Sequence, residues 1–244
     1  MIRPFITIAV FIAAWWTITA FTSIPPFMLP APDAVAQALW TQAPYLASNA
    51  GVTLGEILLG LLTGTLLGGC AALGIAASST LQRWLWPILV LSQAIPVFTL
   101  APLLVLWLGF GIGSKVAMAV LVIFFPVTAN FLDGLRRTEP GWLDLARTMN
   151  GSLWHILLHL RLPAALPAFA SGLRVATAVA PIGAIFGEWT GASSGLGYVM
   201  INANARIQTN LMFAALVILA AMTITLYVLV DAGLRRLLTW APGG

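Results

Sequence analysis

Apolar residues in this chain gather into long, continuous runs that are separated by short polar segments. A helix needs about 20 apolar residues to cross the hydrocarbon core of a membrane. Polar backbone groups in lipid must be satisfied within helices or a closed barrel, and continuous runs lack the alternation of barrel strands. The pattern therefore predicts an all-α integral membrane protein with six transmembrane helices, at Phe5–Phe21, Gly55–Ala77, Trp86–Leu108, Val116–Leu132, Ala168–Phe186 and Leu211–Val230.

The composition indicates that lipid is the main solvent. Only 7% of the residues are charged and 60% are hydrophobic, whereas a soluble domain carries about 25% charged residues. The formal net charge of +4 is too thinly spread to indicate a nucleic-acid partner. The single Cys70 has no partner for an intrachain disulfide. The first apolar run holds Trp15 and Trp16 and no small-x-small cleavage site, so we interpret it as a retained span rather than a signal peptide.

The distribution of positive charge predicts the orientation of the spans, because cytoplasmic loops carry an excess of Arg and Lys. With the N-terminus placed inside, the outside segments hold only Lys115 and Arg206. Both termini are therefore expected to face the cytoplasm. The inside segments then hold Arg3, Arg83, Arg136, Arg137, Arg147, Arg161, Arg235 and Arg236.

The first outside segment is rich in proline between Pro25 and Pro32. Such a segment is expected to be extended and stiff. Asp33 is then expected to cap a short helix, Ala34–Trp40, that lies at the outer surface.

Gly60, Gly64 and Gly68 recur every four residues in the second predicted span, which places them on one helix face. Small residues on one face allow two helix backbones to approach closely. The three glycines therefore predict tight helix packing, either within the subunit or at an interface between two copies of the chain.

Proline and amide residues inside the spans mark a candidate pathway. Gln93 and Pro96 interrupt the third span, and Asn130 follows Pro126 in the fourth. Proline removes a helical hydrogen bond, and broken membrane helices are tolerated where they line a cavity or pack on protein. Two interpretations stay open: static kinks, or a pathway with Gln93, Pro96 and Asn130 facing inward.

Two charges belong to the fifth span. Arg174 lies about 10 Å inside it at the helical rise per residue. Charges at that depth are costly and often functional, although a long Arg side chain also snorkels to the membrane surface. We expect Arg174 to snorkel or to form a salt bridge between subunits. Glu188, at the outer end, is expected to be an interfacial charge, with a role in the pathway as the alternative.

The most informative segment is the polar loop at 133–163, between the fourth and fifth spans. Pro140 suits the first turn of a helix, and Asn150-Gly151 tolerates the left-handed backbone that ends one. Ser152 is expected to cap a second helix, which Leu162-Pro163 would end. The predicted apolar faces are Trp142, Leu145, Ala146 and Met149 on the first helix, and Leu153, Ile156, Leu157 and Leu160 on the second. An idle interfacial hairpin is the alternative to a functional loop.

This loop resembles the EAA loop of ABC-importer permeases, whose pattern is Glu-Ala-Ala, three residues, Gly, nine residues and Ile-x-Leu-Pro. Aligned on Leu162-Pro163, the chain has Asp144 in place of the Glu and Asn150 in place of the Gly, with Gly151 just after. Asn also accepts the left-handed conformation, so the turn is expected to survive. The other aligned positions are Leu145 and Ala146 at the alanines and Leu160 at the Ile.

The resemblance covers nearly the whole chain. The segment Gln93–Gly109, Lys115, and Gly187-Glu188-Trp189 with Gly195-Leu196-Gly197 are similar to permeases of the nitrate/sulfonate/taurine branch. Residues 133–138 and 202–209 look most like permeases for hydroxymethylpyrimidine, a precursor of the thiamine pyrimidine. The resemblance implies one type I ABC-importer (MetI-like) transmembrane domain over residues 1–244, with its coupling loop at about 133–163.

The resemblance also implies partners in a bacterial inner membrane. Two permease copies would form the pathway as a homodimer, a cytoplasmic ABC ATPase dimer would drive it, and an extracytoplasmic binding protein would deliver the solute. The first loop helix would lie in a groove of the ATPase. The permease would be no enzyme and need no cofactor, and it has no Gly-rich phosphate loop ending in Lys-Ser or Lys-Thr. The implied coupling residues are Trp142, Asp144, Ala146, Met149, Asn150, Gly151, Leu162 and Pro163.

Two other classes of protein compete with this interpretation. Ser193 lies in a G-x-S-x-G pattern typical of serine hydrolases, but a nucleophile needs a base within hydrogen-bond reach. The two histidines, His155 and His159, are predicted on the other side of the membrane. An ion-coupled secondary transporter would place acidic residues or inverted repeats at mid-membrane, and the sequence suggests neither.

Overall fold

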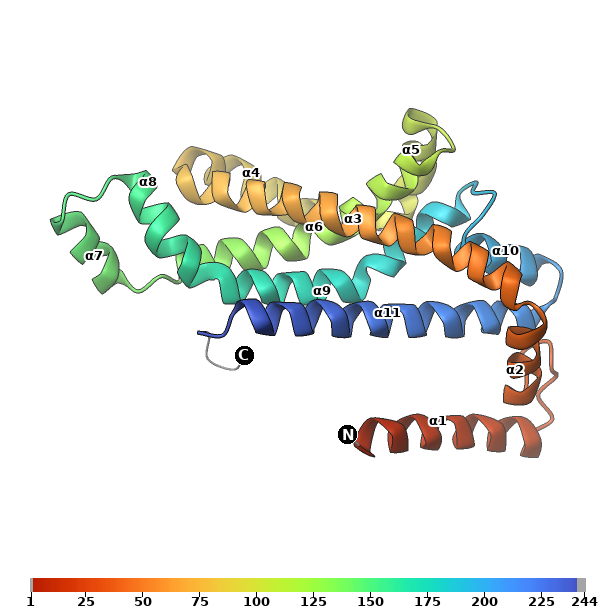
Figure 1. Ribbon diagram of the computed structural model, residues 1–244. Helices are drawn as coiled ribbons and strands as arrows, with labels where there is room; N and C mark the ends of the chain where they lie inside the picture. The colour runs from red at the N-terminus through yellow and green to blue at the C-terminus, as the bar shows by residue number, and fades with distance from the viewer. Residues whose placement is uncertain (1, 241–244) are drawn as a thin grey trace.

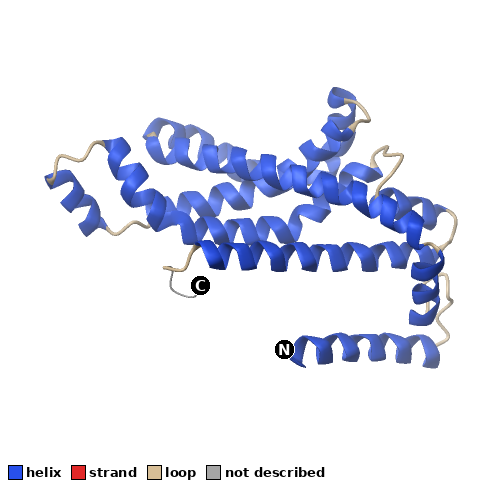
Figure 2. Cartoon of the chain, in the orientation of Figure 1, coloured by secondary structure: helices blue, strands red, loops and turns tan. Residues whose placement is uncertain are grey.

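The computed structural model describes residues 2–240, and every regular element in that range is a helix (Figures 1 and 2). The side chains of Arg3 and Phe5 fall outside the described ones, so predictions that rest on them are not addressed. In chain order the elements are α1 (Ile2–Phe21), α2 (Pro32–Thr41), α3 (Ala43–Ala77), α4 (Ser79–Ser92), η1 (Val97–Leu100), α5 (Ala101–Leu108), α6 (Ile112–Arg136), α7 (Pro140–Thr148), α8 (Leu153–Ile156), η2 (Leu157–Arg161), α9 (Leu162–Trp189), α10 (Leu196–Ala205) and α11 (Thr209–Leu237).

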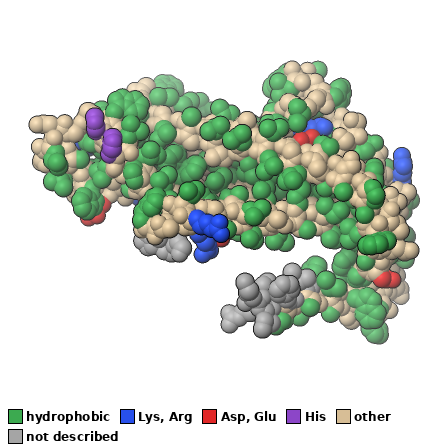
Figure 3. Space-filling view, in the orientation of Figure 1, with side chains coloured by type: hydrophobic (Ala, Val, Ile, Leu, Met, Phe, Trp, Pro, Cys, Tyr) green, Lys and Arg blue, Asp and Glu red, His purple; other side chains and the backbone are tan. Residues whose placement is uncertain are grey.

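The body of the molecule is a bundle of long helices, with α3, α6, α9 and α11 side by side in Figure 1. On the face shown in Figure 3, hydrophobic side chains are spread over the whole bundle and charged side chains are few. Four helical segments among the described residues are long and apolar enough to cross a membrane: Ala43–Ala77, Ile112–Arg136, Leu153–Trp189 and Thr209–Leu237. The all-helical membrane architecture is therefore confirmed, whereas the count of six spans stays a prediction.

The third predicted span, Trp86–Leu108, is not one continuous helix. The segments Ser79–Ser92 and Val97–Leu108 meet at an angle of 94°. Pro96 lies in the break, where its ring disfavours a helical conformation of the preceding residue and its nitrogen donates no hydrogen bond. This bent pair is either one broken span or a re-entrant segment.

The N-terminal helix α1 lies apart from the bundle and is joined to it through α2 (Figure 1). Its outer contact is Trp15, whose indole Nε1 donates to the carbonyl of Pro30 at 3.0 Å and whose ring packs against Phe213. The expectation that Asp33 caps the following helix is wrong. That helix already begins at Pro32, whose fixed φ suits a first turn, and Asp33 lies inside it.

Helices α3, α6 and α9 pack closely because glycines line their contacts. A Cβ at Gly183 would lie 2.6 Å from the Cα of Ala119, and one at Gly187 would lie 2.9 Å from the Cα of Lys115. No side chain fits at such spacing without a backbone shift, so α6 and α9 touch backbone to backbone over much of their length. The result is a tightly packed three-helix unit that runs from one end of the bundle to the other.

The glycines of α3 belong to the same unit. A Cβ at Gly60 would lie 2.5 Å from the Cβ of Ala119, and one at Gly64 would lie 2.8 Å from Ile123 Cγ2. At Gly68 the nearest atoms, in Phe124, Thr128 and Val127, would be 3.1 Å away. All three glycines therefore face α6 of the same chain. Of the two predicted alternatives, this arrangement is packing within the subunit.

Candidate functional sites at the two ends of the bundle

The loop between α6 and α9 folds into two helices that meet at a sharp turn, at the far left of Figure 1. Asn150 has a left-handed φ of 56°, and the N–H of Gly151 donates to the carbonyl of Ala146 at 2.9 Å. A Cβ at Gly151 would lie 2.8 Å from that carbonyl oxygen. The turn therefore depends on both residues. Asn150 supplies the left-handed backbone conformation, and Gly151 allows the chain to approach the carbonyl of Ala146 closely. Ser152 caps α8 by accepting from the N–H of His155 at 3.3 Å.

The inner face of this loop is an apolar groove of about 690 Å³, which we name the α7–α8 groove. Trp142 and Met149 are 56% and 76% exposed although both are large and apolar. Asp144 lies off the groove and pairs with Arg147 at 3.0 Å on the solvent side of α7. An exposed apolar face on a short helix with a charged back suits a partner that takes the helix in a groove. The groove is lined by Trp142, Leu145, Ala146, Met149, Asn150, Gly151, Ser152, His155, Ile156, His159 and Leu160.

The second loop helix does not end at Leu162-Pro163 as the sequence suggested. It passes through one π-helical turn, η2, directly into α9, so that residues 153–189 form one helical path. The wide turn loosens the backbone just before Pro163, whose ring would otherwise clash with the preceding turn. The predicted apolar face is also partly wrong, because Ile156 and Leu157 are buried whereas Leu153 is 83% exposed.

The candidate pathway residues are not brought together. Gln93 and Pro96 lie exposed at the break after α4. The Asn130 side chain is used locally, since its Nδ2 donates to the carbonyl of Pro126 at 2.8 Å. Arg174 and Glu188 are fourteen residues apart on α9, or about 21 Å along the helix. Within a single chain the five residues therefore lie at separate places, and their role in a pathway stays a prediction.

Arg174 is held inside the subunit. Its Nε lies 2.6 Å from Asp231 Oδ1 on α11, and the other oxygen of Asp231 accepts from Arg235 at 2.9 Å. The ion pair found for Arg174 therefore lies within the chain, whereas the sequence predicted snorkelling or a bridge between subunits. The pair joins α9 to α11 near the end of the bundle that carries α7 and α8.

At the opposite end of α9, Glu188 is 1% exposed, so the expectation of an interfacial charge is wrong. The hydroxyl of Thr53 donates to Glu188 Oε1 at 2.6 Å, and the N–H of Gly197 donates to Oε2. Glu56 adjoins Glu188 and pairs with the ammonium of Lys115 at 3.3 Å. We name these four side chains, together with Asn49, the Glu188 cluster.

Sequence reasoning overlooked most of this cluster. The second span was predicted to begin at Gly55, whereas α3 begins at Ala43 and carries Asn49, Thr53 and Glu56. These three recur at helical spacing and are all buried. A polar stripe with that spacing ahead of an apolar run was the available signal.

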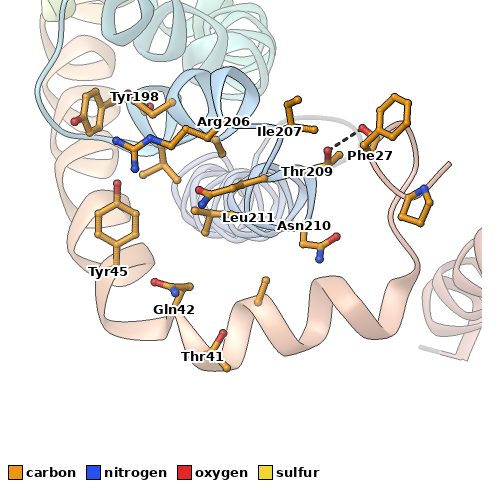
Figure 4. Close-up of a pocket in the computed structure, with 16 residues that line it drawn as sticks. Phe27, Thr41, Gln42, Tyr45, Tyr198, Arg206, Ile207, Thr209, Asn210 and Leu211 are labelled. Atoms are coloured by element: carbon orange, nitrogen blue, oxygen red, sulfur yellow. Dashed lines mark hydrogen bonds between the residues drawn. The ribbon is translucent and has the colours of Figure 1, made fainter.

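A polar pocket of about 620 Å³ opens beside this end, between α2, the start of α3, and α10 with the turn after it. In Figure 4, Tyr198 and Arg206 lie on one side of the opening, and Tyr45 and Gln42 face them from the other. Thr209 closes one edge through a 2.8 Å hydrogen bond to the carbonyl of Phe27. We name it the α2–α10 pocket. Apart from Arg206 and its segment 202–209, none of its polar residues was singled out from the sequence.

Residues 60–239 match the family of binding-protein-dependent transport system inner membrane components. The chain belongs to this family. It is 53% identical over 236 residues to the probable ABC transporter permease protein of Haemophilus influenzae, covering 97% of this chain and 96% of the relative. It is 36% identical to the formylaminopyrimidine transport permease protein of Halalkalibacterium halodurans, with 92% and 90% covered. It is 30% identical to the taurine transport system permease protein of Escherichia coli, with 96% and 88% covered.

The protein is therefore an ABC transporter permease, a multi-pass component of the bacterial inner membrane, and the resemblance to the nitrate/sulfonate/taurine branch is confirmed. It is a transport subunit and no enzyme, with ATP hydrolysis on a separate subunit. The geometry agrees, because Ser193 and the two histidines lie at opposite ends of α9, whose 28 residues span about 42 Å. In Figure 3 the histidines gather at the α8 end.

Proposed function

We propose that this permease forms the translocation pathway of an ATP-driven importer and is driven by a cytoplasmic ABC ATPase that binds the α7–α8 groove. The observation that carries the proposal is the groove itself: large apolar side chains are exposed on α7, next to α8, which continues through η2 into the membrane helix α9. Burying Trp142 and Met149 against a partner would remove their apolar surface from water. A push on the loop would then reach α9 through the helical path that begins at α8.

The contact with the ATPase is tested by a matched pair of substitutions on α7. Met149→Glu places a charge in the groove, where Met149 is 76% exposed. Thr148→Glu places the same charge on the neighbouring residue, which is exposed but outside the groove. Pull-down by the tagged permease should lose the ATPase with Met149→Glu and retain it with Thr148→Glu. Equal retention by both variants would contradict the proposal.

We also propose that both termini and the α7–α8 loop are cytoplasmic and that the chain crosses the membrane six times. The excess of arginine in the inside segments supports this orientation. The test is a cysteine at Thr148, which is exposed and lies outside the α7–α8 groove, in a Cys70→Ser background, because Cys70 is also exposed. The new thiol should resist a membrane-impermeant reagent in intact cells and react after permeabilisation. Labelling from outside would reverse the orientation.

The pathway is proposed to lie between two copies of the permease, related by a two-fold axis. One chain supplies too few spans to enclose a pathway, and a single gene product most simply gives an isologous pair. Helix α1 supports this arrangement, since its Phe11 and Trp16 are 71% and 55% exposed on a helix that leaves the bundle. Native mass spectrometry of the purified transporter should find two identical permeases. One copy, or two different permeases, would overturn the homodimer.

For the solute we propose hydroxymethylpyrimidine or a related thiamine precursor, delivered by an extracytoplasmic binding protein. The similarity of residues 202–209 to such permeases and the 36% identical formylaminopyrimidine permease support this class. The alternative is an aliphatic sulfonate, taurine or nitrate, which the 30% identical taurine permease favours. Calorimetric titration of the cognate binding protein with hydroxymethylpyrimidine, taurine and nitrate should give tight binding to the pyrimidine alone.

A further inference from the structure

The start of α10 has no cap of its own and is held by side chains from other helices. The N–H of Gly195 donates to Asn49 Oδ1 at 2.8 Å, the N–H of Leu196 donates to Thr53 Oγ1 at 2.8 Å, and the N–H of Gly197 donates to Glu188. The first N–H groups of a helix have no partner inside it. Here three successive N–H groups are satisfied by α3 and α9, so α10 is tied to both helices at its first turn.

Glu188 is central to this arrangement. It accepts from Gly197 of α10 and from Thr53 of α3 while belonging to α9. A carboxylate at a helix N-terminus is also favoured by the helix dipole. The glycines around it leave room for nothing else: a Cβ at Gly195 would collide with the Glu188 carboxyl group, and one at Gly197 would lie 2.8 Å from Glu188 Oε2. The motif Gly195-Leu196-Gly197 is thus shaped around one side chain.

The same α9 that carries Glu188 begins at the coupling loop. Residues 153–189 form one helical path, and α9 is packed backbone to backbone on α6. Helix α10, in turn, places Tyr198, Asn202 and Arg206 on the wall of the α2–α10 pocket. A displacement of α9 at the α7–α8 groove therefore has one hydrogen-bonded joint through which it reaches this pocket.

We propose that Glu188, with Thr53, is a positioning residue that locks α10 to α9, so that the α2–α10 pocket moves with the coupling loop during transport. The inference rests on the proposed function, in which an ATPase binds the loop and a binding protein approaches the other end. It assigns a role to Glu188 and Thr53 that requires neither residue to touch the solute. Asn49 completes the joint from α3.

The test uses the complete transporter in proteoliposomes with Thr53→Val, Thr53→Ser and Glu188→Gln. Valine matches the shape of threonine but removes the hydroxyl that bridges Leu196 and Glu188, and serine restores it. The matched control is Thr223→Val on α11, where the hydroxyl bonds only to the carbonyl of Leu219 four residues back in its own helix. If Glu188→Gln does not assemble, the two Thr53 variants decide the question.

The first readout is the distance between spin labels at Asn204 on α10 and Ile182 on α9, both exposed, in a Cys70→Ser background. The doubly labelled permease is diluted into unlabelled copies, so that distances between the two proposed subunits do not contribute. The parent protein, Thr53→Ser and Thr223→Val should then give one narrow distance distribution. Thr53→Val and Glu188→Gln should broaden it. A distribution that stays narrow in both would overturn the joint, whatever the transport activity does.

The second readout is ATP hydrolysis with and without the purified cognate binding protein. Coupling between two sites typically changes a binding affinity about 5-fold or more, and we take the same factor as the expected change in the rate. We expect the stimulation by the binding protein to fall by that factor in Thr53→Val, with basal hydrolysis retained. Broadened distances with full stimulation would refute the transmission of movement. Absence of stimulation in the parent protein would instead refute the proposed function, while the distance result would still decide the joint.

Discussion

The two ends of α9 are built in opposite ways. At the α7–α8 groove, apolar side chains are exposed and the helix pair is held to the bundle mainly through its continuity with α9. At the Glu188 cluster, charged and polar side chains are buried and nearly every one has a named partner. The groove exposes apolar groups where polar groups would be expected. The Glu188 cluster buries polar groups where apolar groups would be expected.

The two ends differ in what satisfies them. Exposed apolar groups cost free energy until something covers them, and in the proposed function the ATPase covers the groove. Buried charges are tolerated when they are paired and hydrogen-bonded, and the Glu188 cluster is satisfied in this way from within the chain, except at Glu56 Oε2, which has no hydrogen-bond partner among the described residues. Substitutions at the groove should therefore affect assembly, whereas substitutions at the cluster should affect the fold and its movement.

The largest effect is expected from Ala146→Pro in α7. Proline inside a helix costs roughly 3 kcal/mol relative to alanine. We expect a helix as short as α7 to unfold at that cost. The permease should still insert, because no predicted span is touched, but solute uptake should vanish and the ATPase should dissociate or hydrolyse ATP without transport.

The control for this variant is Ser193→Ala in the loop before α10, where uptake should stay nearly intact. Uptake assays and pull-down on the same membranes measure both. Normal transport with a bound ATPase in Ala146→Pro would remove the coupling role from the loop. Loss of uptake in Ser193→Ala would reopen the hydrolase interpretation.

At the other end, Gly195→Ala should destabilise the permease more than Gly109→Ala. Both glycines have a positive φ, at 110° and 78°, so either substitution costs about 1–3 kcal/mol of backbone strain. Only at Gly195 does the new Cβ also collide, with the Glu188 carboxyl group, whereas the space around Gly109 is open. Thermal unfolding of the two purified variants in detergent measures the difference. Equal unfolding temperatures would show that the Glu188 cluster accommodates a methyl group at Gly195 without loss of stability.

A smaller effect is expected inside the three-helix unit. Gly64→Ala places a methyl group 2.8 Å from Ile123 Cγ2, and overpacking of this kind costs about 1–3 kcal/mol. Gly69→Ala, on a side of the same helix where an added Cβ meets nothing within 4 Å, should be neutral or slightly stabilising, because alanine favours the helix. The unfolding temperature should fall in Gly64→Ala and should stay level or rise in Gly69→Ala. A destabilising Gly69→Ala would mean that this face is covered in the assembled transporter.

The smallest effect concerns the Arg174–Asp231 pair, which is partly exposed, so that solvent screens the attraction between its charges. The two halves should not be equivalent. Asp231→Asn leaves two arginines without their carboxylate, whereas Arg174→Gln leaves Asp231 with Arg235. Asp231→Asn should therefore lower the unfolding temperature more, and the reverse order would show that Arg235 does not hold Asp231.

Local signals in the sequence were sufficient for the turn between the two loop helices. Asn150 adopts the left-handed backbone conformation, and the hydroxyl of Ser152 caps the next helix, both as expected. Each of these effects depends only on residues nearby in the sequence. The length and apolarity of the runs were likewise enough to predict membrane helices. The apolar pattern could not show that α3 reaches back to Ala43, because its first turns mix polar and apolar residues. Asn49 and Thr53 are buried there through contacts with α9 and the start of α10.

The errors come from contacts between distant segments. Glu188 and Lys115 look like charges at a membrane surface until α3 and α10 cover them, and Arg174 looks unpaired until α11 brings Asp231 beside it. The continuity at Pro163 was missed for another reason. A proline read in isolation ends a helix, and only the wider turn before it explains why this helix goes on.

That wide turn has a consequence for how this region can change in length. A π-helical turn is an α-helical turn with one residue to spare, so it adds a residue without rotating the helix that follows. Removing one residue between Leu157 and Arg161 would therefore keep the glycine face of α9 aligned with α6. It would also take away the slack that accommodates the ring of Pro163. The extra residue of the π-helical turn therefore leaves the orientation of α9 unchanged and makes room for the ring of Pro163. Without the proline, the helix would have no need of that residue.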